Sequence, residues 1–180
     1  SARKAERVVA ATVLQAPPTA PAPSDQERDA LVESVRQALY ASKIASYAQG
    51  FSLMAAASAE FGWQLDLGRI ASVFRGGCII RARFLGDIMA AYEENPSLLN
   101  LMVAPFFAHR LNACVPAWRK AVTSGILAGI PLPAFTSALS YFDGYRSERL
   151  PASLLQAQRD YFGAHRFERT DREGTFHHDW

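Results

Sequence analysis

The longest uninterrupted helical pattern in the sequence runs from Asp25 to about Phe61. This stretch contains no proline and a single glycine, Gly50, and its apolar residues recur at helical spacing. Ser24, followed three residues later by Glu27, forms the capping-box pattern of a helix start. A helix of about 36 residues would be about 54 Å long, which exceeds the width of a small domain. We therefore expect one long helix that crosses the core or reaches a partner.

Glycine and proline divide the remainder of the chain into shorter helical segments, and no long stretch has the alternating pattern of a strand. Pro116 falls inside one of these segments, where we expect a kink or two helices that meet. The shorter helices are expected at about residues 1–15, 66–74, 78–94, 97–102, 106–127, 134–146 and 152–162. The sequence predicts an all-α fold, a multi-helix domain with one long helix and an irregular C-terminal tail.

Proline content marks the main boundary near the N-terminus. Residues 16–23 (APPTAPAP) hold four prolines and predict an extended connector. We therefore predict a short helix and Ala/Pro-rich connector at residues 1–23, a helical domain at residues 24–162, and a tail at residues 163–180. The sequence begins with neither Met nor an apolar signal core, so we expect it to be a piece of a longer protein.

Charge and cysteine content exclude several classes of partner. The 19 Lys and Arg residues against 17 Asp and Glu residues leave a dispersed net charge of +2, so we expect no nucleic-acid partner and no membrane partner. No run of about 18 apolar residues is present, which excludes a membrane span. The two cysteines, Cys78 and Cys114, are too few for a disulfide framework or a cysteine-based zinc site, and they indicate a cytoplasmic location.

Motifs of self-contained active sites are missing from the sequence, which has no GxGxxG, GxxxxGK[ST], GxSxG or HExxH. Three of the four histidines, His165, His177 and His178, lie in the tail, and with Asp179 they could hold zinc or nickel. His177 and His178 are adjacent and have no helical pairing, so we favour a polar tail and predict no metal site.

Arginines form a second group of candidate residues. Arg75, Arg81 and Arg83 flank the sequence GGCII, and guanidinium groups suit the recognition of phosphate or carboxylate. Arginines on helices more commonly pair with acids or cover apolar surface, and we favour this structural role for the three.

Large aromatic residues punctuate the charged tail. Phe167, Phe176 and Trp180 would be costly to leave in water, so we expect them to dock. They dock either on the core of the chain itself or on a partner subunit. In the second case they would carry Arg159 and His165 along as polar contacts.

Several motifs resemble 6-phosphogluconate dehydrogenases, and the similarity extends from about residue 31 to residue 180. The long motifs are residues 39–51 (LYASKIASYAQGF), 74–82 (FRGGCIIRA) and 156–165 (QAQRDYFGAH). The shorter ones are residues 95–96 (NP), 129–131 (GIP), 141–146 (YFDGYR) and 176–180 (FHHDW). Because these motifs are long and ordered along the chain, they are far more specific than a single glycine pattern.

The resemblance implies an enzyme of the pentose phosphate pathway. Such an enzyme oxidises 6-phosphogluconate with NADP and decarboxylates it to ribulose 5-phosphate without a metal. It consists of a Rossmann domain and a large helical domain, and it works as a homodimer whose C-terminal tail completes the substrate site of the other subunit. In this scheme Arg159 contacts the substrate phosphate in trans, and His165 is the second in-trans substrate contact.

The matched region begins after the family's cofactor loop, catalytic lysine and proton-donating acid. The resemblance therefore implies that NADP is bound mainly by an N-terminal domain outside this chain, and that the chain alone is inactive. Phe74 replaces a common Trp, while Arg166 and Phe167 replace common Thr and Tyr residues. The alternative is a non-catalytic helical dimerisation module with the same fold, and a Rossmann motif upstream would distinguish the two.

Overall fold

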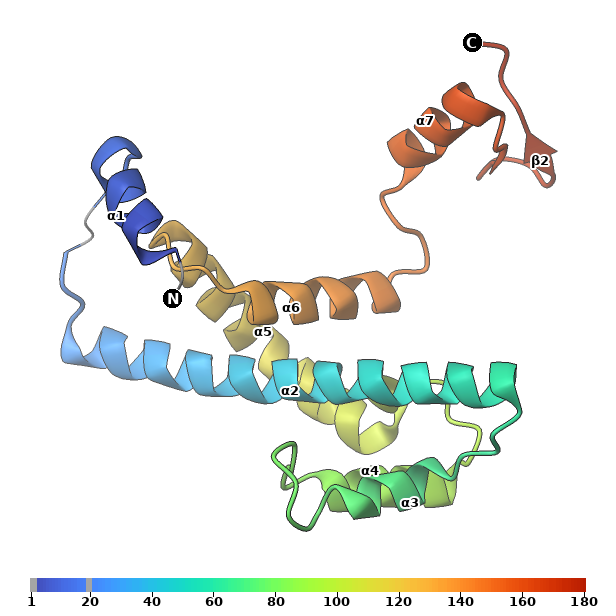
Figure 1. Cartoon of the computed structure of the whole chain (residues 1–180), viewed down its shortest axis with the longest axis horizontal. Helices are drawn as coiled ribbons and strands as arrows, with labels where there is room; N and C mark the ends of the chain where they lie inside the picture. The colour runs from blue at the N-terminus through green and yellow to red at the C-terminus, as the bar shows by residue number, and fades with distance from the viewer. Residues whose placement is uncertain (1–2, 19–20) are drawn as a thin grey trace. The chain divides into compact units, whose positions relative to one another are not determined.

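The computed structural model describes residues 3–18 and 21–180 (Figure 1). Two compact units make up the chain, residues 1–142 and residues 143–180. The helices are α1 (Lys4–Val13), α2 (Asp25–Phe61), α3 (Leu67–Val73), α4 (Leu85–Glu94), the 3-10 turn η1 (Leu101–Val103), α5 (Pro105–Leu127), α6 (Pro133–Arg146) and α7 (Ser153–Gly163). Two short strands follow, β1 (Phe167–Glu168) and β2 (Thr175–Phe176). The predominance of helix confirms the all-α prediction.

The long helix α2 has the bounds that the sequence predicts. Its capping box is formed, because the backbone N–H of Glu27 donates to Ser24 Oγ (3.3 Å) and the backbone N–H of Ser24 donates to Glu27 Oε2 (2.8 Å). Gly62 ends the helix in the left-handed conformation, with a φ of +66°, which a residue without a Cβ adopts at little cost.

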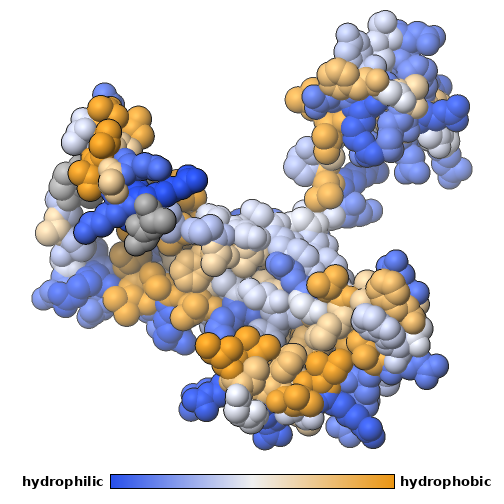
Figure 2. Space-filling model, viewed as in Figure 1, coloured by the Kyte–Doolittle hydropathy of each residue, from blue (hydrophilic) through white to orange (hydrophobic). Residues whose placement is uncertain are grey.

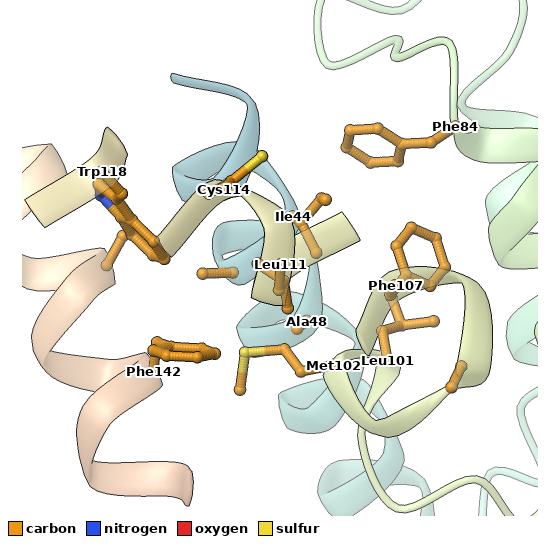
Figure 3. Close-up of a cluster of buried hydrophobic side chains, with 14 of the residues drawn as sticks. Ile44, Ala48, Phe84, Leu101, Met102, Phe107, Leu111, Cys114, Trp118 and Phe142 are labelled. Atoms are coloured by element: carbon orange, nitrogen blue, oxygen red, sulfur yellow. The ribbon is translucent and has the colours of Figure 1, made fainter. Parts of the chain in front are cut away.

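The core of the first unit lies where α2 packs against α5. The buried face of α2 is lined by small residues, since Ala38, Ala41, Ala45 and Ala48 are each 0% exposed. Larger side chains fill the space around this face, and they come from α2, η1, α5, α6 and the residue before α4. Figure 3 shows nine of them: Ile44, Phe84, Leu101, Met102, Phe107, Leu111, Cys114, Trp118 and Phe142. Burying these apolar side chains is the main force that holds the helices together.

Phe84 joins the α3–α4 part of the unit to this core. Its ring meets the rings of Tyr40 (5.9 Å between centroids), Tyr47 (5.2 Å) and Phe107 (5.9 Å) edge to face. The two tyrosines belong to α2 and Phe107 belongs to α5, so one aromatic side chain anchors the start of α4 to both long helices.

The prediction of a helix over residues 78–94 is wrong for its first seven residues, because α4 begins only at Leu85. Gly77 has a φ of +67°, and successive turns follow in which Arg81 N–H donates to Cys78 O and Leu85 N–H donates to Ala82 O. Residues 97–102 form only the turn η1 at their end, which the side chain of Asn100 caps by accepting from Met102 N–H (2.9 Å).

Pro116 does not divide its segment, since α5 is a single helix from Pro105 to Leu127. The turns on either side are buried through Cys114 and Trp118, and this packing compensates for the hydrogen bond that a proline cannot donate. The Ala/Pro connector has no helix or strand in its described part, and its residues 19–20 lie outside the described residues.

The tail is not wholly irregular, because β1 and β2 form a small antiparallel sheet. Phe167 lies opposite Phe176, and Glu168 lies opposite Thr175. Within the described part of the chain, no helix combines the length and apolar character that crossing a bilayer requires.

Candidate functional site

The two substrate-contact candidates, Arg159 and His165, lie together at the C-terminal end of α7. The helix stops because Ala164 takes the left-handed conformation (φ +49°) and its N–H donates to Asp160 O at 2.8 Å. This turn carries His165 back beside the helix, where its Nε2 contacts Nη2 of Arg159. A guanidinium can only donate, so Nε2 accepts and the proton of the neutral ring is on Nδ1.

An open cavity of about 360 Å³ lies beside this pair, lined by Gln158, Arg159, Phe162, Gly163 and His165. Arg159 and His165 are both exposed, so their polar atoms are accessible to a ligand. The planar guanidinium suits a phosphate or carboxylate, and the imidazole of His165 can donate from Nδ1. The pair therefore has the hydrogen-bond donors that an anion requires.

Asp160 organises the whole tail around α7, although the sequence had not indicated it. Its side chain is 0% exposed, and its Oδ1 accepts from Arg166 N–H (2.9 Å) and from His177 Nδ1 (2.9 Å). Its Oδ2 accepts from His178 N–H (3.0 Å) and from Trp180 Nε1 (3.2 Å). One carboxylate thus holds four residues of the tail, which lie between 6 and 20 positions further along the chain.

The charged form of Asp160 is strongly favoured. Burial alone would raise the pKa of this carboxyl, but the hydrogen bonds from His178, His177, Arg166 and Trp180 outweigh it and hold the pKa well below the ordinary value. The sequence did contain one signal for this residue. An acid in the last turn of a helix opposes the negative end of the helix dipole, and such a placement needs compensation from elsewhere.

The tail aromatics pack within their own unit. Cζ of Arg172 lies 4.6 Å from the centre of the Phe176 ring, and the ring of Trp180 meets that of Tyr161 edge to face at 5.8 Å. Packing is incomplete, because the side chain of Trp180 remains 59% exposed and that of Tyr161 62% exposed.

The remaining candidates from the sequence are placed differently. His177 is engaged by Asp160, with its Nε2 also 3.8 Å from Asp179 Oδ1. Among the described residues, no three His, Cys, Asp or Glu side chains are grouped to hold a metal ion. Arg75, Arg81 and Arg83 lie in the first unit, on the connection between α3 and α4.

Comparison with known proteins gives a consistent result. The sequence matches the family described as 6-phosphogluconate dehydrogenase, C-terminal domain, over residues 1–180. The decarboxylating 6-phosphogluconate dehydrogenase of Rattus norvegicus is 51% identical over 181 residues, covering 100% of this chain and 37% of the rat protein. The NADP(+)-dependent, decarboxylating enzyme of Bacillus subtilis is 51% identical over 180 residues, covering 100% of this chain and 38% of that protein.

A solved structure shares the fold. It is the Plasmodium falciparum 6-phosphogluconate dehydrogenase, studied in its apo form, with its cofactor NADP+ and with its substrate 6-phosphogluconate. The TM-score is 0.85 at 39% sequence identity, and the match covers 98% of this chain and 37% of that one. The chain therefore spans little more than a third of the length of its relatives. Its sequence and fold together place it in the 6-phosphogluconate dehydrogenase family, of which it is a C-terminal domain.

Proposed function

We propose that this chain serves as the C-terminal part of an NADP-dependent, decarboxylating 6-phosphogluconate dehydrogenase. It supplies a dimer scaffold, and its C-terminal unit, residues 143–180, supplies Arg159 and His165 as contacts to 6-phosphogluconate bound in the partner subunit. The observation that carries the proposal is the juxtaposition of Arg159, in the last turns of α7, and His165, on the tail that Asp160 holds to α7, beside an open cavity.

The role of the two residues is binding and orientation. Arg159 would pair with the phosphate of the substrate through two parallel hydrogen bonds, and His165 would donate to a sugar oxygen. Holding the phosphate and one oxygen of the sugar chain would help to fix the reacting carbons against the groups that carry out oxidation and decarboxylation. The sequence contains no GxGxxG loop, so the residues present do not form an NADP site of their own, and we assign the cofactor mainly to a preceding domain.

Exposed apolar side chains support a dimer. On α7, Leu154 is 83% exposed and Phe162 is 76% exposed, and Figure 2 shows hydrophobic surface on this unit. On α2, Leu31, Val35 and Leu39 recur every four residues and are 36%, 42% and 51% exposed. Contiguous apolar faces of this kind favour burial against another protein surface, and a second copy of the subunit would bury both.

Subunit mixing in the full-length enzyme tests the proposal. One variant carries Arg159→Ala in α7, and the other is inactivated in the preceding domain. In a mixed dimer, one site combines an intact preceding domain with an intact partner tail, so random mixing restores about a quarter of the wild-type activity. Mixing that restores no activity, while each variant still dimerises, would show that the tail acts within its own subunit.

The isolated 180-residue chain provides the matching negative control. It is expected to show no turnover of 6-phosphogluconate with NADP, because the proton-transfer groups are assigned to the preceding domain. Turnover by the isolated chain would overturn that assignment.

A further inference from the structure

Four cationic side chains line one surface cavity of the unit formed by residues 1–142. The cavity has a volume of about 460 Å³ and is lined by Lys43, Arg75, Arg81, Ala82, Arg83 and Leu85. Lys43 comes from α2, and the three arginines come from the connection between α3 and α4. Four of its six lining residues are therefore cationic and none is acidic.

These four cations have no counter-charge among the described residues. Within the part of the chain that the structure describes, none of the four makes an ion pair or a hydrogen bond through its side chain. Neighbouring arginines behave differently, since Arg36 donates to Glu33 (2.6 Å) and Arg69 pairs with Asp66 (3.2 Å). Unpaired like charges around one cavity repel each other, and a bound anion would relieve that repulsion.

The connection that carries the arginines is anchored at both ends. Before the arginines, the ring of Phe74 meets that of Phe51 on α2 edge to face at 6.3 Å. After them, Phe84 is only 4% exposed and packs among the aromatic rings of the core. Because both ends are fixed on packed helices, the guanidinium groups need little reorganisation to meet a ligand.

We propose that this cavity, which we term the basic cavity, is an anion-binding site for a small molecule that carries phosphate groups. Guanidinium groups bind phosphate oxygens in a bidentate manner, and three of them with one ammonium can neutralise a multiply charged phosphate. The volume is in the range of small-ligand pockets and too small for a folded protein element. The inference does not depend on the proposed function, because the residues belong to the first unit and not to the tail.

Titration of the 180-residue chain with inorganic pyrophosphate tests the proposal. In about 20 mM salt, where screening is weak, calorimetry is expected to show saturable binding of one pyrophosphate, with a Kd of about 1 mM or tighter. The double variant Arg81→Gln/Arg83→Gln is expected to bind at least about tenfold more weakly, because each guanidinium contributes charge-assisted hydrogen bonds. All four cations are exposed apart from their cavity contacts, so circular dichroism should show unchanged helix content.

The matched control is Arg28→Gln/Arg69→Gln. It also removes two positive charges from the first unit, so its net charge equals that of the test variant. Arg28 pairs with Asp25 (3.1 Å) and Arg69 with Asp66 (3.2 Å), and neither lines the basic cavity. Pyrophosphate affinity of the control should stay within about twofold of the wild type. If pyrophosphate affinity fell equally in both double variants, net charge alone would explain the loss, and the proposal would be overturned. Binding of poly-glutamate without binding of pyrophosphate would also overturn it, in favour of an acidic protein segment.

Discussion

The carboxylate of Asp160 accepts a hydrogen bond from the indole of Trp180 at 3.2 Å, although 20 residues separate the two along the chain. The same carboxylate holds the backbone of Arg166 and His178 and the ring of His177. The placement of the tail next to Arg159 therefore depends on a residue that does not itself line the cavity beside Arg159 and His165.

Replacing Asp160 by asparagine should release the tail from α7. Asparagine keeps the size of the side chain but removes the charge and one acceptor oxygen, so the buried donors lose their shared partner. We expect the indole N–H resonance of Trp180 to move to the position of an unstructured tryptophan, with faster amide exchange across residues 165–180. In the full-length enzyme, KM for 6-phosphogluconate should rise more than kcat falls.

The control for that substitution is Asp171→Asn in the same tail. Asp171 pairs with the neighbouring exposed Arg169 (2.7 Å) and is 59% exposed itself, so the loss of its charge should leave the Trp180 resonance in place. An unchanged Trp180 resonance in the Asp160→Asn variant would contradict the central role of Asp160.

Acidification should release the tail in a defined direction. Because the pKa of Asp160 is lowered in the folded state, the unfolded state binds more protons between the two pKa values, and stability rises with pH in that range. The contribution is complete above the ordinary carboxyl pKa of about 3.9 and is lost as the pH falls further. The Trp180 indole resonance should be constant between about pH 5 and pH 7 and should change below about pH 4. A Trp180 transition between about pH 5 and pH 7 in the unsubstituted chain would contradict this prediction and assign the release of the tail to another group.

Removal of the Trp118 side chain should destabilise the first unit strongly. Trp118 is 0% exposed and packs against Phe142 at 5.8 Å between ring centres, so Trp118→Ala should lower the free energy of unfolding by about 3–5 kcal/mol. Trp118→Phe should cost less, because Nε1 of Trp118 has no hydrogen-bond partner among the described residues. Urea unfolding measures both, and equal costs would show that the indole N–H is needed.

A methyl group at Gly125 should collide with the connector that follows α5. A Cβ there would overlap Cδ1 of Leu132 and approach its Cγ to 3.2 Å. Because Leu132 is half-buried and its side chain can rotate, and because alanine is the better helix former within α5, Gly125→Ala should lower the free energy of unfolding by at most about 1 kcal/mol. Shortening the neighbour should restore part of the loss, so Gly125→Ala/Leu132→Ala should be more stable than the sum of the single effects predicts. Strict additivity in urea unfolding would place the collision elsewhere.

Local signals explain which parts of the fold could be predicted. The bounds of α2 follow from Ser24, Glu27 and Gly62, whose effects act over a single turn of helix. Turns over residues 78–84 were missed because the burial of Phe84, a tertiary contact, overrides an acceptable helical pattern. Strands of two residues each are too short to show a period, so β1 and β2 left no pattern either.

The candidate site also contains residues that the sequence predicted and one that it did not. Arg159 and His165 were identified by the resemblance of a motif and not by periodicity, and their contact across the end of α7 depends on the left-handed Ala164. Asp160 was missed because its partners lie up to 20 residues away in a segment without regular structure. Hydrophobic periodicity in one sequence does not indicate contacts between residues that are 20 positions apart in irregular structure.

The buried alanine face of α2 restricts the size of the side chains it can hold more than their polarity. Ala38, Ala41, Ala45 and Ala48 are each 0% exposed, so added methylenes would meet packed neighbours. Ser34 on the same helix is only 6% exposed, and its hydroxyl is accommodated because Oγ donates to the Ala30 carbonyl one turn earlier (2.8 Å). Serine should therefore be accepted at these four positions more readily than valine, although valine is the more apolar residue. Among natural variants of this chain, we expect substitutions on this buried face to exchange alanine for other small residues, so that side-chain volume stays nearly constant.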